Sequence, residues 1–434
     1  PDNAITITTF GDWKLDDTGK MLSLTYNIFR RHIHSFSDVT TEDITGAQTS
    51  LTDAGKNRYC IHSVKFDASL PFRTFKIETG VAYTGINNKT ELEIKNYIGN
   101  EWMNNLLQSN SFNYTEHTAA IYASAEKNFS DGLFGKLGLR YEYTDVSGRQ
   151  PVAAARNDKT YGYIFPSLTL SWNNNRIGRI SFSYSSGIIR PSFGDLNPFR
   201  YFTTVSDYYS GNPDLKPGIT HNAEINYSFK GIYTVIYNSF THNAIWNVTR
   251  FNTDGSQYTQ PENCLETNKA GLYASYNRSI FSWWNMNIGG EVYYNYAGSK
   301  ISDFRDGQDH SWSGKLEFNT SWMLNRSKTL IFNLRFSHLF PHHDKMVRYS
   351  SVSLLGCDLR YALLDNRLNL ALAVSDPFGW NITKSKSYFS GYTLESRNNI
   401  HAHAVSFRVS WSLGRQKVNN PYRDSKERES RRSN

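Results

Sequence analysis

Strict alternation of apolar and polar residues is the feature that most constrains how this chain can fold. Near the C-terminus, Val405, Phe407, Val409, Trp411 and Leu413 are separated by single polar residues. A helix would scatter these five side chains around its circumference, whereas a strand places all of them on one face. The same alternation recurs at 137–144, 223–229, 312–322 and 330–337. The sequence therefore predicts an all-β protein.

The connections between the alternating runs are short and long in turn. Short turn signals fall at 70–71, 130–132, 173–175, 230–231, 325–327 and 365–366. Longer polar connections fall at 34–56, 87–111, 147–159, 190–217, 251–256, 300–308, 340–346 and 377–396. A chain that reverses at every connection has about 16 antiparallel up-and-down strands, with 4–14 as a candidate seventeenth. Short turns at one end and long loops at the other are typical of a transmembrane β-barrel.

Strand length and composition favour the same architecture. The runs at 218–230, 233–250 and 269–280 exceed the usual 5–6 residues of a globular strand, and a membrane strand needs about 9–11. Trp312 and Trp322 lie at the two ends of one apolar face, as in the aromatic girdles of outer-membrane barrels. No run approaches the roughly 18 apolar residues of a membrane-spanning helix, so a helical membrane protein is excluded.

Other classes fit the sequence less well. Aromatic residues make up 15% of the chain, which argues against disorder, and three cysteines in 434 residues exclude a disulfide scaffold. A propeller would show a recurring blade signature of about 40 residues, and a multi-domain sandwich would show linkers; we find neither. One segment departs from the alternation: Leu92, Tyr97, Ile98, Trp102, Leu106 and Leu107 lie at roughly helical spacing, which predicts a short helix or folded loop outside the membrane.

The most specific motif runs from Ile189 to Phe229. A strand ends at Arg190-Pro191, Asn197-Pro198 follows, and a turn rich in structure breakers precedes a strand that contains Glu224. That turn reads Gly211-Asn212-Pro213-Asp214-Leu215-Lys216-Pro217. The motif resembles the barrel of TonB-dependent receptors, specifically the outer-membrane β-barrel family common in Bacteroidetes. Gly218 stands where the family usually has an acidic residue, and Ile225 where it has Leu.

Two weaker motifs extend the resemblance over about 112–414. Ser410-Trp411-Ser412-Leu413-Gly414 is similar to the closing strand of the family, and 112–123 is similar to a recurring family strand. The resemblance implies nutrient uptake through a 22-stranded barrel that is closed by an N-terminal plug and energised by TonB. The chain has no recognisable signal peptide at Pro1-Asp2-Asn3-Ala4 and no recognisable plug. We therefore expect residues 1–414 to form the C-terminal barrel portion of a larger receptor; a smaller, plugless barrel stays open as an alternative.

The candidate ligand-binding residues lie in the loop between Pro191 and Pro217. This loop holds six aromatic residues: Phe193, Phe199, Tyr201, Phe202, Tyr208 and Tyr209. The last five are our candidates, because such rings can stack on a sugar or an aromatic siderophore while tyrosine hydroxyls form hydrogen bonds. The alternative is that the rings pack the loop onto the barrel rim.

Other chemistry is weakly indicated. The histidine pairs His32/His34, His342/His343 and His401/His403 lack further ligands nearby, so we expect no metal site and no cofactor. No catalytic motif is present, so we do not expect an enzyme. Charged strand residues such as Arg140 and Glu142 are expected to face the lumen. The basic tail at 415–434 is expected to be a disordered periplasmic segment rather than a nucleic-acid-binding one.

Three hypotheses for function follow. The first is a receptor barrel for TonB-dependent uptake of a bulky nutrient such as a glycan, a peptide or a siderophore. The second is a plugless outer-membrane barrel with a porin, adhesive or structural role, and the third is a soluble β-rich carbohydrate-binding protein. For the first hypothesis the expected partners are outer-membrane lipid and the TonB system acting through a plug region, with a surface lipoprotein as a further candidate.

Overall fold

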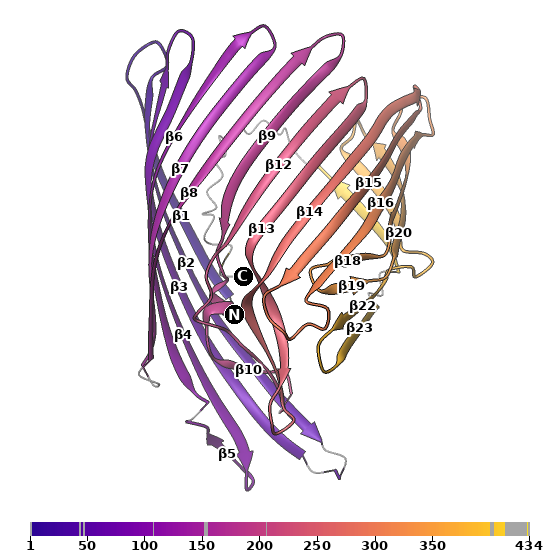
Figure 1. The fold of residues 1–434 in the computed structure, drawn as a ribbon. Helices are drawn as coiled ribbons and strands as arrows, with labels where there is room; N and C mark the ends of the chain where they lie inside the picture. Colours follow the sequence, from indigo (N-terminus) through magenta and orange to yellow (C-terminus); the bar gives the residue numbers. More distant parts are fainter. Residues whose placement is uncertain are drawn as a thin grey trace.

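The computed structural model describes residues 2–42, 45–46, 48–106, 108–151, 155–204, 206–399, 403–412 and 432. Long antiparallel strands form a tilted, curved wall around a lumen (Figure 1). The 20-stranded main sheet contains seventeen wall strands and three short strands. The wall strands are β1 (Asp2–Lys14), β2 (Met21–Glu42), β3 (Gln48–Pro71), β4 (Lys76–Ile98), β6 (Asn110–Ser130), β7 (Leu133–Gln150), β8 (Ala155–Asn174), β9 (Gly178–Ile189), β12 (Gly218–Phe229), β13 (Ile232–Phe251), β14 (Gln257–Phe281), β15 (Trp284–Ser299), β16 (Gln308–Met323), β17 (Leu330–Leu339), β20 (Val352–Leu363), β21 (Leu368–Ser375) and β24 (Ala404–Trp411).

The remaining elements are short. β5 (Glu101–Asn104) pairs with the end of β4, and α1 (Phe193–Leu196), β10 (Arg200–Phe202) and β11 (Asp207–Ser210) lie between β9 and β12. A separate four-stranded sheet consists of β18 (His342–Asp344), β19 (Val347–Tyr349), β22 (Ile382–Tyr388) and β23 (Thr393–Asn399).

Each wall strand pairs antiparallel with its neighbour in chain order, from β1 round to β24. Within the described residues, β1 pairs only with β2, and β24 only with β21. The predicted up-and-down barrel and its 16–17 strands in this chain are confirmed. Leu413 and Gly414 of the closing motif lie outside the described residues.

Short turns lie at one end of the wall and long loops at the other, as the alternation of connections predicts (Figure 1). Two of the short turns require glycine. Gly132 has φ +88° and Gly231 has φ +87°, a region that L side chains rarely adopt. A Cβ at either position would lie 2.2 Å from a carbonyl oxygen of a neighbouring strand. These two glycines therefore let the strands reverse within two residues.

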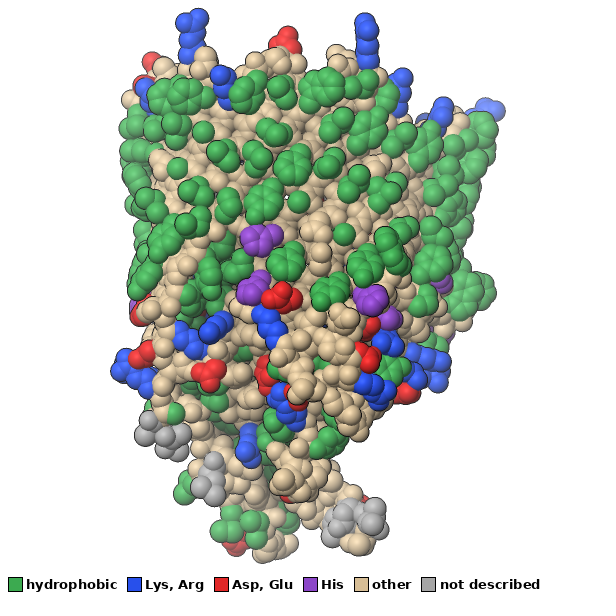
Figure 2. Space-filling model, viewed as in Figure 1, with side chains coloured by type: hydrophobic (Ala, Val, Ile, Leu, Met, Phe, Trp, Pro, Cys, Tyr) green, Lys and Arg blue, Asp and Glu red, His purple; other side chains and the backbone are tan. Residues whose placement is uncertain are grey.

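The alternating residues face opposite sides of the wall. Val405, Phe407, Val409 and Trp411 all point outward, with exposed fractions between 56% and 74%. Figure 2 shows hydrophobic side chains spread over most of the outer wall, with charged side chains along the rim at the short turns and toward the long-loop end. This outer surface fits the apolar band of a membrane barrel. Among the described residues, no helix is long and apolar enough to span a membrane.

The apolar face of the longest strands changes sides along their length. On β3, Val64 points outward and is exposed, whereas Tyr59 and Ile61 point inward and are buried. β6 makes the same switch between the exposed Ile121 and the buried Phe112. Nearer the short turns, therefore, the wall is apolar outside and polar inside. Nearer the long loops, it is polar outside and encloses an apolar core.

Of the short helix and the folded loop expected as alternatives for 91–107, the helix is wrong, and this switch explains why. β4 continues to Ile98 and then turns into β5. Leu92 and Ile94 point inward and are buried, whereas the glutamate before each of them, Glu91 and Glu93, points outward. The segment is thus a strand whose apolar residues face the core, and Leu107 lies outside the described residues.

The four-stranded sheet packs beside the long-loop ends of β13–β15 around a second apolar cluster. Its buried members are Ala244, Val248, Cys264, Leu265, Ala297, Phe304, Met346 and Phe389. Next to this cluster, Arg250 forms ion pairs with Glu262 and Asp303. Cys60, Cys264 and Cys357 are free thiols on β3, β14 and β20. This second core holds the four-stranded sheet against the long-loop ends of β13–β15.

Candidate functional site in the barrel lumen

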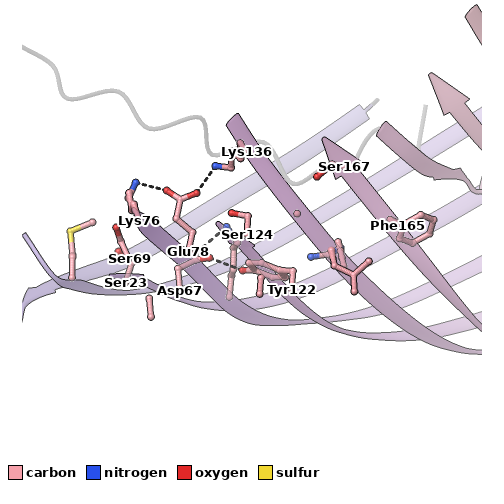
Figure 3. A pocket seen from close by; sticks show the side chains of 17 residues that line it. Ser23, Asp67, Ser69, Lys76, Glu78, Tyr122, Ser124, Lys136, Phe165 and Ser167 are labelled. Atoms are coloured by element: carbon pink, nitrogen blue, oxygen red, sulfur yellow. Dashed lines mark hydrogen bonds and ion pairs between the residues drawn. The ribbon is translucent and has the colours of Figure 1, made fainter. Parts of the chain in front are cut away.

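The inner wall near the short turns carries a hollow lined by alternating charges (Figure 3). Its volume is about 590 Å³. Glu78 of β4 accepts hydrogen bonds from Lys76, at 2.5 Å, and from Lys136 of β7, at 2.7 Å. Beside them, the Tyr122 hydroxyl donates to Asp67 at 2.6 Å. These side chains on β3, β4, β6 and β7 form ion pairs and hydrogen bonds with one another, so this part of the lumen is a polar, charged surface.

Residues 190–217 fold into the long-loop half of the lumen. The segment leaves β9 at a proline, which cannot donate to a strand ladder, and begins with the single helical turn α1. A capping box fixes this turn: the Ser192 hydroxyl accepts from the Asp195 amide at 3.0 Å, and the Asp195 carboxylate accepts from the Ser192 amide at 3.1 Å. A hairpin of β10 and β11 follows, and β11 pairs in parallel with the start of β14. The segment is therefore attached to the wall at its middle as well as at both ends.

Apolar contacts hold the segment against the opposite side of the wall. Phe193, Leu196, Phe199 and Leu215 are each at most 5% exposed. They belong to one buried cluster with Tyr59 and Ile61 of β3, Ile86, Leu92 and Ile94 of β4, Phe112 and Tyr114 of β6 and Val146 of β7. The ring of Phe193 lies 5.4 Å from that of Tyr59 and 5.6 Å from that of Tyr114, between centroids. A loop between β9 and β12 thus reaches strands β3–β7 across the lumen.

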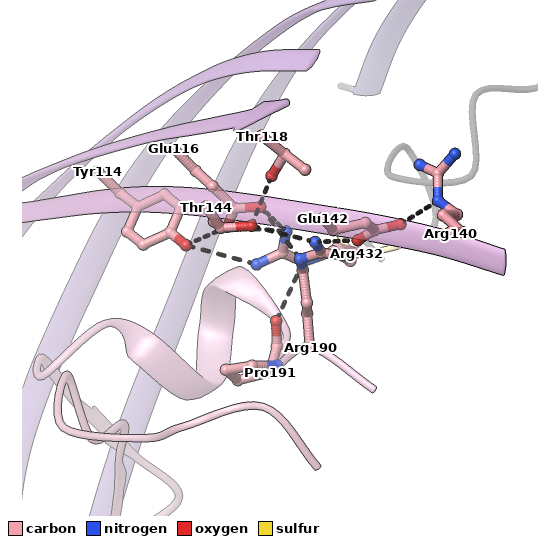
Figure 4. A network of polar contacts seen from close by, with 9 residues as sticks. All are labelled: Tyr114, Glu116, Thr118, Arg140, Glu142, Thr144, Arg190, Pro191 and Arg432. Atoms are coloured by element: carbon pink, nitrogen blue, oxygen red, sulfur yellow. Dashed lines mark hydrogen bonds and ion pairs between the residues drawn. The ribbon is translucent and has the colours of Figure 1, made fainter. Parts of the chain in front are cut away.

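A buried ionic network lies beside this cluster (Figure 4). Arg190 of the segment is 6% exposed and contacts two carboxylates of the wall. Its Nη2 donates to Glu142 at 2.8 Å, and its Nε lies 3.4 Å from Glu116. Arg140 also donates to Glu142, at 2.6 Å, and Tyr114 donates to Glu116. Because burial of an unpaired charge is costly, Arg190 and the two glutamates hold one another in place.

The guanidinium of Arg432 completes the network. Its Nη1 lies 3.0 Å from each oxygen of Glu116, and its Nε donates to the carbonyl of Pro191 at 3.1 Å. Its Cζ lies 4.8 Å from the centroid of the Phe193 ring. Of the tail at 415–434, only Arg432 is among the described residues. Glu116 thus accepts two guanidinium groups, one from the motif and one from the C-terminal end of the chain.

The candidate aromatic residues divide into two groups. Phe199 is buried, the Tyr201 hydroxyl accepts from the Asn197 amide at 2.7 Å, and the Tyr209 hydroxyl donates to Asp195 at 2.7 Å. Burial raises the pKa of both tyrosines, and the bond to Asp195 raises that of Tyr209 further. Both hydroxyls are therefore protonated at neutral pH, and these three side chains serve the internal packing of the segment.

The second group forms a partly exposed aromatic platform, made of Phe202, Tyr208 and Tyr258. The centroid of Tyr208 lies 5.5 Å from that of Phe202 and 5.8 Å from that of Tyr258, against which it is stacked. The guanidinium of Arg200 lies 4.7 Å from the Tyr208 ring. The sequence did not identify Tyr258 or Arg200 as members of this site. Tyr208 and Tyr258 are fifty positions apart and meet through the parallel pairing of their strands, and no local sequence pattern indicates that pairing. Rings beside a guanidinium can stack on a planar or sugar ligand.

The sequence comparison identifies the family of this chain. The model of the outer membrane protein beta-barrel family matches residues 13–411. The chain belongs to this family. No curated protein sequence matches the chain.

Solved receptors share the fold of this outer-membrane barrel. The pyoverdine outer membrane receptor FpvA from Pseudomonas aeruginosa PAO1 matches with a TM-score of 0.62 at 12% identity, over 95% of this chain and 62% of the receptor. The ferric yersiniabactin uptake receptor FyuA from Yersinia pestis matches with a TM-score of 0.61 at 13% identity, over 94% and 60%. The ferric citrate transporter FecA matches with a TM-score of 0.61 at 11% identity, over 94% and 61%. The chain spans about 60% of the length of these receptors.

Family membership places the barrel in the outer membrane, and the soluble alternative is therefore wrong. In such barrels the short turns face the periplasm and the long loops face the exterior. The candidate segment at 190–217 is accordingly an extracellular loop folded into the outer-membrane barrel. The charged hollow of Figure 3 lies toward the periplasmic end.

The other residues of the motif fix the loop within the barrel. Asn197 is 2% exposed, and a Cβ on Gly211 would lie 2.3 Å from its carbonyl oxygen. The Asn212 side chain donates to the Pro261 carbonyl at 3.1 Å. The carbonyls of Pro213 and Leu215 accept from Lys159 at 2.5 and 3.2 Å, the Lys216 amide donates to Asn263 at 2.7 Å, and the Pro198 carbonyl accepts from the Ser210 hydroxyl at 3.3 Å. Pro217 ends the loop, and Glu224 lies on β12 opposite Tyr237, away from these contacts.

The histidine pairs of the barrel lie apart from this site. His32 and His34 are on the outer face of β2, and His342 and His343 are in β18. His401 lies outside the described residues, and His403 precedes β24. Within the part of the chain that the structure describes, no group of three or more His, Cys, Asp or Glu side chains is arranged to hold a metal ion.

Proposed function

We propose that this chain is the barrel portion of a TonB-dependent receptor that imports a bulky nutrient, namely a glycan, a peptide or a siderophore. The observation that carries the proposal is the extracellular loop folded into the lumen and tied to the wall by buried apolar and ionic contacts. A loop held in this way narrows the route through the barrel and offers a defined surface to an incoming ligand. The matched structures include the ferric yersiniabactin uptake receptor, the ferric citrate transporter and the pyoverdine outer membrane receptor. The proposal assigns transport, and no catalysis, to the chain.

The aromatic platform is the proposed first contact for the nutrient. Phe202, Tyr208 and Tyr258 are partly exposed, and rigid aromatic rings give contact area at low entropic cost. Arg200 beside them favours a ligand that carries a carboxylate, a catecholate or another anionic group. Energy for release would come from TonB through a plug region, and a surface lipoprotein is a further proposed partner.

Growth of the native host with and without its TonB system tests the proposal. Strains that lack the gene for this protein are grown on single glycans, peptides or iron–siderophore complexes as limiting nutrients. We expect one nutrient to support growth only when both the gene and TonB are present. The double variant Tyr208→Ala/Tyr258→Ala should reduce uptake at least tenfold, whereas Tyr141→Ala on the lipid-facing wall should not. Uptake that is independent of TonB would contradict the proposal.

A porin role is the second candidate, because the periplasmic half of the lumen is lined by charged pairs such as Lys76–Glu78 and Lys136–Glu78. Conductance in a planar bilayer separates the two. A porin would give large, steady currents without TonB, and a receptor would give little current. The adhesive and structural roles of a plugless barrel predict neither TonB-dependent uptake nor conductance.

A further inference from the structure

Four tyrosine–histidine pairs recur on the outer face of the wall. They are Tyr26–His62, Tyr83–His117, Tyr184–His221 and Tyr294–His310. In the first three, the hydroxyl lies 2.7–2.8 Å from Nδ1 of the histidine. In all four, the tyrosine and the histidine lie on neighbouring strands, and the histidine comes two positions before the residue that pairs with the tyrosine in the strand register. An extracellular loop connects the two strands of each pair. The repeat therefore marks one level on four different hairpins.

This level is the extracellular border of the apolar belt. Exposed apolar side chains such as Val64 and Val81 lie on the periplasmic side of the pairs. Figure 2 shows histidine side chains at the lower edge of the hydrophobic surface, next to charged ones. Tyrosine, with an apolar ring and a polar tip, is enriched at the interface between membrane and water. The four pairs thus lie at the level of the lipid headgroups.

Immediately beyond Tyr26–His62, the outer face of β2–β4 carries a cluster of basic side chains. The outer basic patch consists of Arg30, His32, His34, Lys56, Arg58 and Lys89. The strand register places Arg58 between His32 and Lys89, and Lys56 beside His34. Tyr59 and Asn88, next to Arg58 and Lys89 in sequence, are buried in the lumen, so the basic side chains point to the outside of the barrel. On β2, Arg30 is the first outward position after Ile28.

The patch carries positive charge that the protein does not neutralise. Lys89 pairs with Glu91 at 2.6 Å. Among the described residues, Arg30, Lys56 and Arg58 form no ion pair within 4.0 Å. The outward acidic side chains next to them on β4 are Glu91 and Glu93, which pair with Lys89 and Lys95. The corresponding rim of β7 and β8 differs, because Arg149 and Arg156 are accompanied there by Asp145 and Asp158. The outer face of β2–β4 therefore carries more unpaired positive charge than the corresponding face of β7–β8.

We propose that the outer basic patch binds the phosphate groups of an anionic lipid in the outer leaflet. Basic side chains at this depth attract anionic headgroups, and an arginine can bind a phosphate with two parallel hydrogen bonds. The exposed Leu24, Val64 and Phe66 on the membrane side of the patch offer an apolar surface to the acyl chains of the same lipid. A lipid satisfies both surfaces at once, whereas a soluble anion satisfies only the charges. The inference rests on the outer-membrane location and is independent of the transported nutrient.

Native mass spectrometry of the purified, delipidated protein in non-ionic detergent tests the inference. The probe is diphosphorylated lipid A, with its dephosphorylated form and phosphatidylcholine as comparisons. We expect one or a few bound molecules of the diphosphorylated form and at least tenfold weaker binding of the other two. The variant Arg30→Gln/Lys56→Gln/Arg58→Gln should lose at least tenfold in affinity. The matched variant Arg149→Gln/Arg156→Gln, on the balanced rim, should bind as the unmodified protein does.

Each result decides the question. Both variants are first checked for the heat-dependent gel mobility of a folded barrel; the substituted side chains are exposed, so folding should persist. Equal binding by the β2–β4 variant overturns the inference, and so does an equal loss in the control variant, since that would indicate unspecific attraction. Inorganic phosphate that binds the patch at millimolar concentration and displaces no lipid would show a site for free anions, which also overturns it.

Discussion

Replacement of Phe193 by alanine tests whether apolar burial holds the inward loop in the lumen. The ring is 2% exposed and packs against Tyr59 and Tyr114 of the opposite wall. α1 is only four residues long, so it has no stability of its own as a helix and depends on these contacts. Phe→Ala in a packed core costs about 3–5 kcal/mol. That free energy is lost from docking of the loop rather than from pairing of the wall strands.

The magnitude converts directly into a measurable population. Since about 1.4 kcal/mol corresponds to a factor of ten, the undocked fraction of the loop should rise by roughly two to three and a half powers of ten. The Gly211 and Asn212 amides donate to the Asn197 and Asp195 carbonyls, at 3.0 and 2.5 Å, only while the loop is folded. Hydrogen exchange at these two amides should accelerate by the same factor, and exchange in the wall strands should not change.

Phe129→Ala provides the matched control. Phe129 lies at the periplasmic end of β6 and is 59% exposed, so the same ring is removed without a cavity in the core. We expect no change in exchange of the loop amides. If Phe193→Ala leaves those amides protected within a factor of three while the barrel stays folded, apolar burial does not hold the loop, and the reasoning is refuted.

Three further predictions concern the same loop. Arg190→Gln should lower the free energy of unfolding in urea by about 3 kcal/mol, the lower end for breaking a buried ion pair, because Arg140 and Arg432 still contact the two glutamates. Arg190→Lys should lower this free energy by less, and a decrease below about 1 kcal/mol for Arg190→Gln would contradict the network. Gly211→Ala should undock the loop, since the new Cβ would lie 2.3 Å from the Asn197 carbonyl oxygen. At Gly391 a Cβ would have no other atom within 4 Å, so Gly391→Ala should leave the loop docked in the same exchange assay. Equal exchange in the two variants would disprove the steric argument. Because the pKa of Tyr209 is raised, the contribution of its hydroxyl to loop docking is complete at pH values below the ordinary tyrosine pKa of about 10 and is lost as the pH rises above it. A fluorophore at Thr204 should therefore report undocking above about pH 10. An unchanged alkaline transition in Tyr209→Phe would show that this residue does not cause it.

The barrel wall could be predicted from the sequence because lipid and water impose their preferences on alternate residues. Each outward residue such as Val405 or Val409 meets lipid, and each turn such as Gly132 must reverse the chain within two residues. Both signals are local in sequence, so no knowledge of distant contacts is needed. This is why the number of strands and the asymmetry of their connections agree with the structure.

The extension of β4 escaped prediction because its surroundings change. Beyond the membrane, the outer face meets water, and the inner face meets the docked loop. Leu92 and Ile94 consequently face inward, and the alternation continues with its apolar face reversed. With Trp102 and Leu106 of the next turn added, the spacing of apolar residues resembles that of a helix. The partner that selects the strand, the loop at 190–217, lies a hundred residues away.

The roles of the aromatic residues also depend on distant partners. The sequence identifies the loop as rich in rings, but Phe199 is buried because the segment happens to meet strands β3–β7. Tyr208 stays accessible because β11 pairs with the outer end of β14, where Tyr258 stacks on it. Composition alone assigns the same character to both residues, and only the route of the loop through the lumen distinguishes them.

The change of apolar face along each long strand also sets how deep the barrel sits. A strand that is apolar outside over one stretch and polar outside over the next satisfies lipid and water at a single height. A shift by one outward position, about 6–7 Å along the strand, would move Arg58 and Arg30 toward the acyl chains or lift Val64 into water. The cost for one strand near the interface is at most about 1 kcal/mol, but the strands are hydrogen-bonded together and must move as one body. The summed cost over all strands fixes the position of the barrel along the membrane normal. The mouth of the lumen therefore stays at a constant height above the lipid surface.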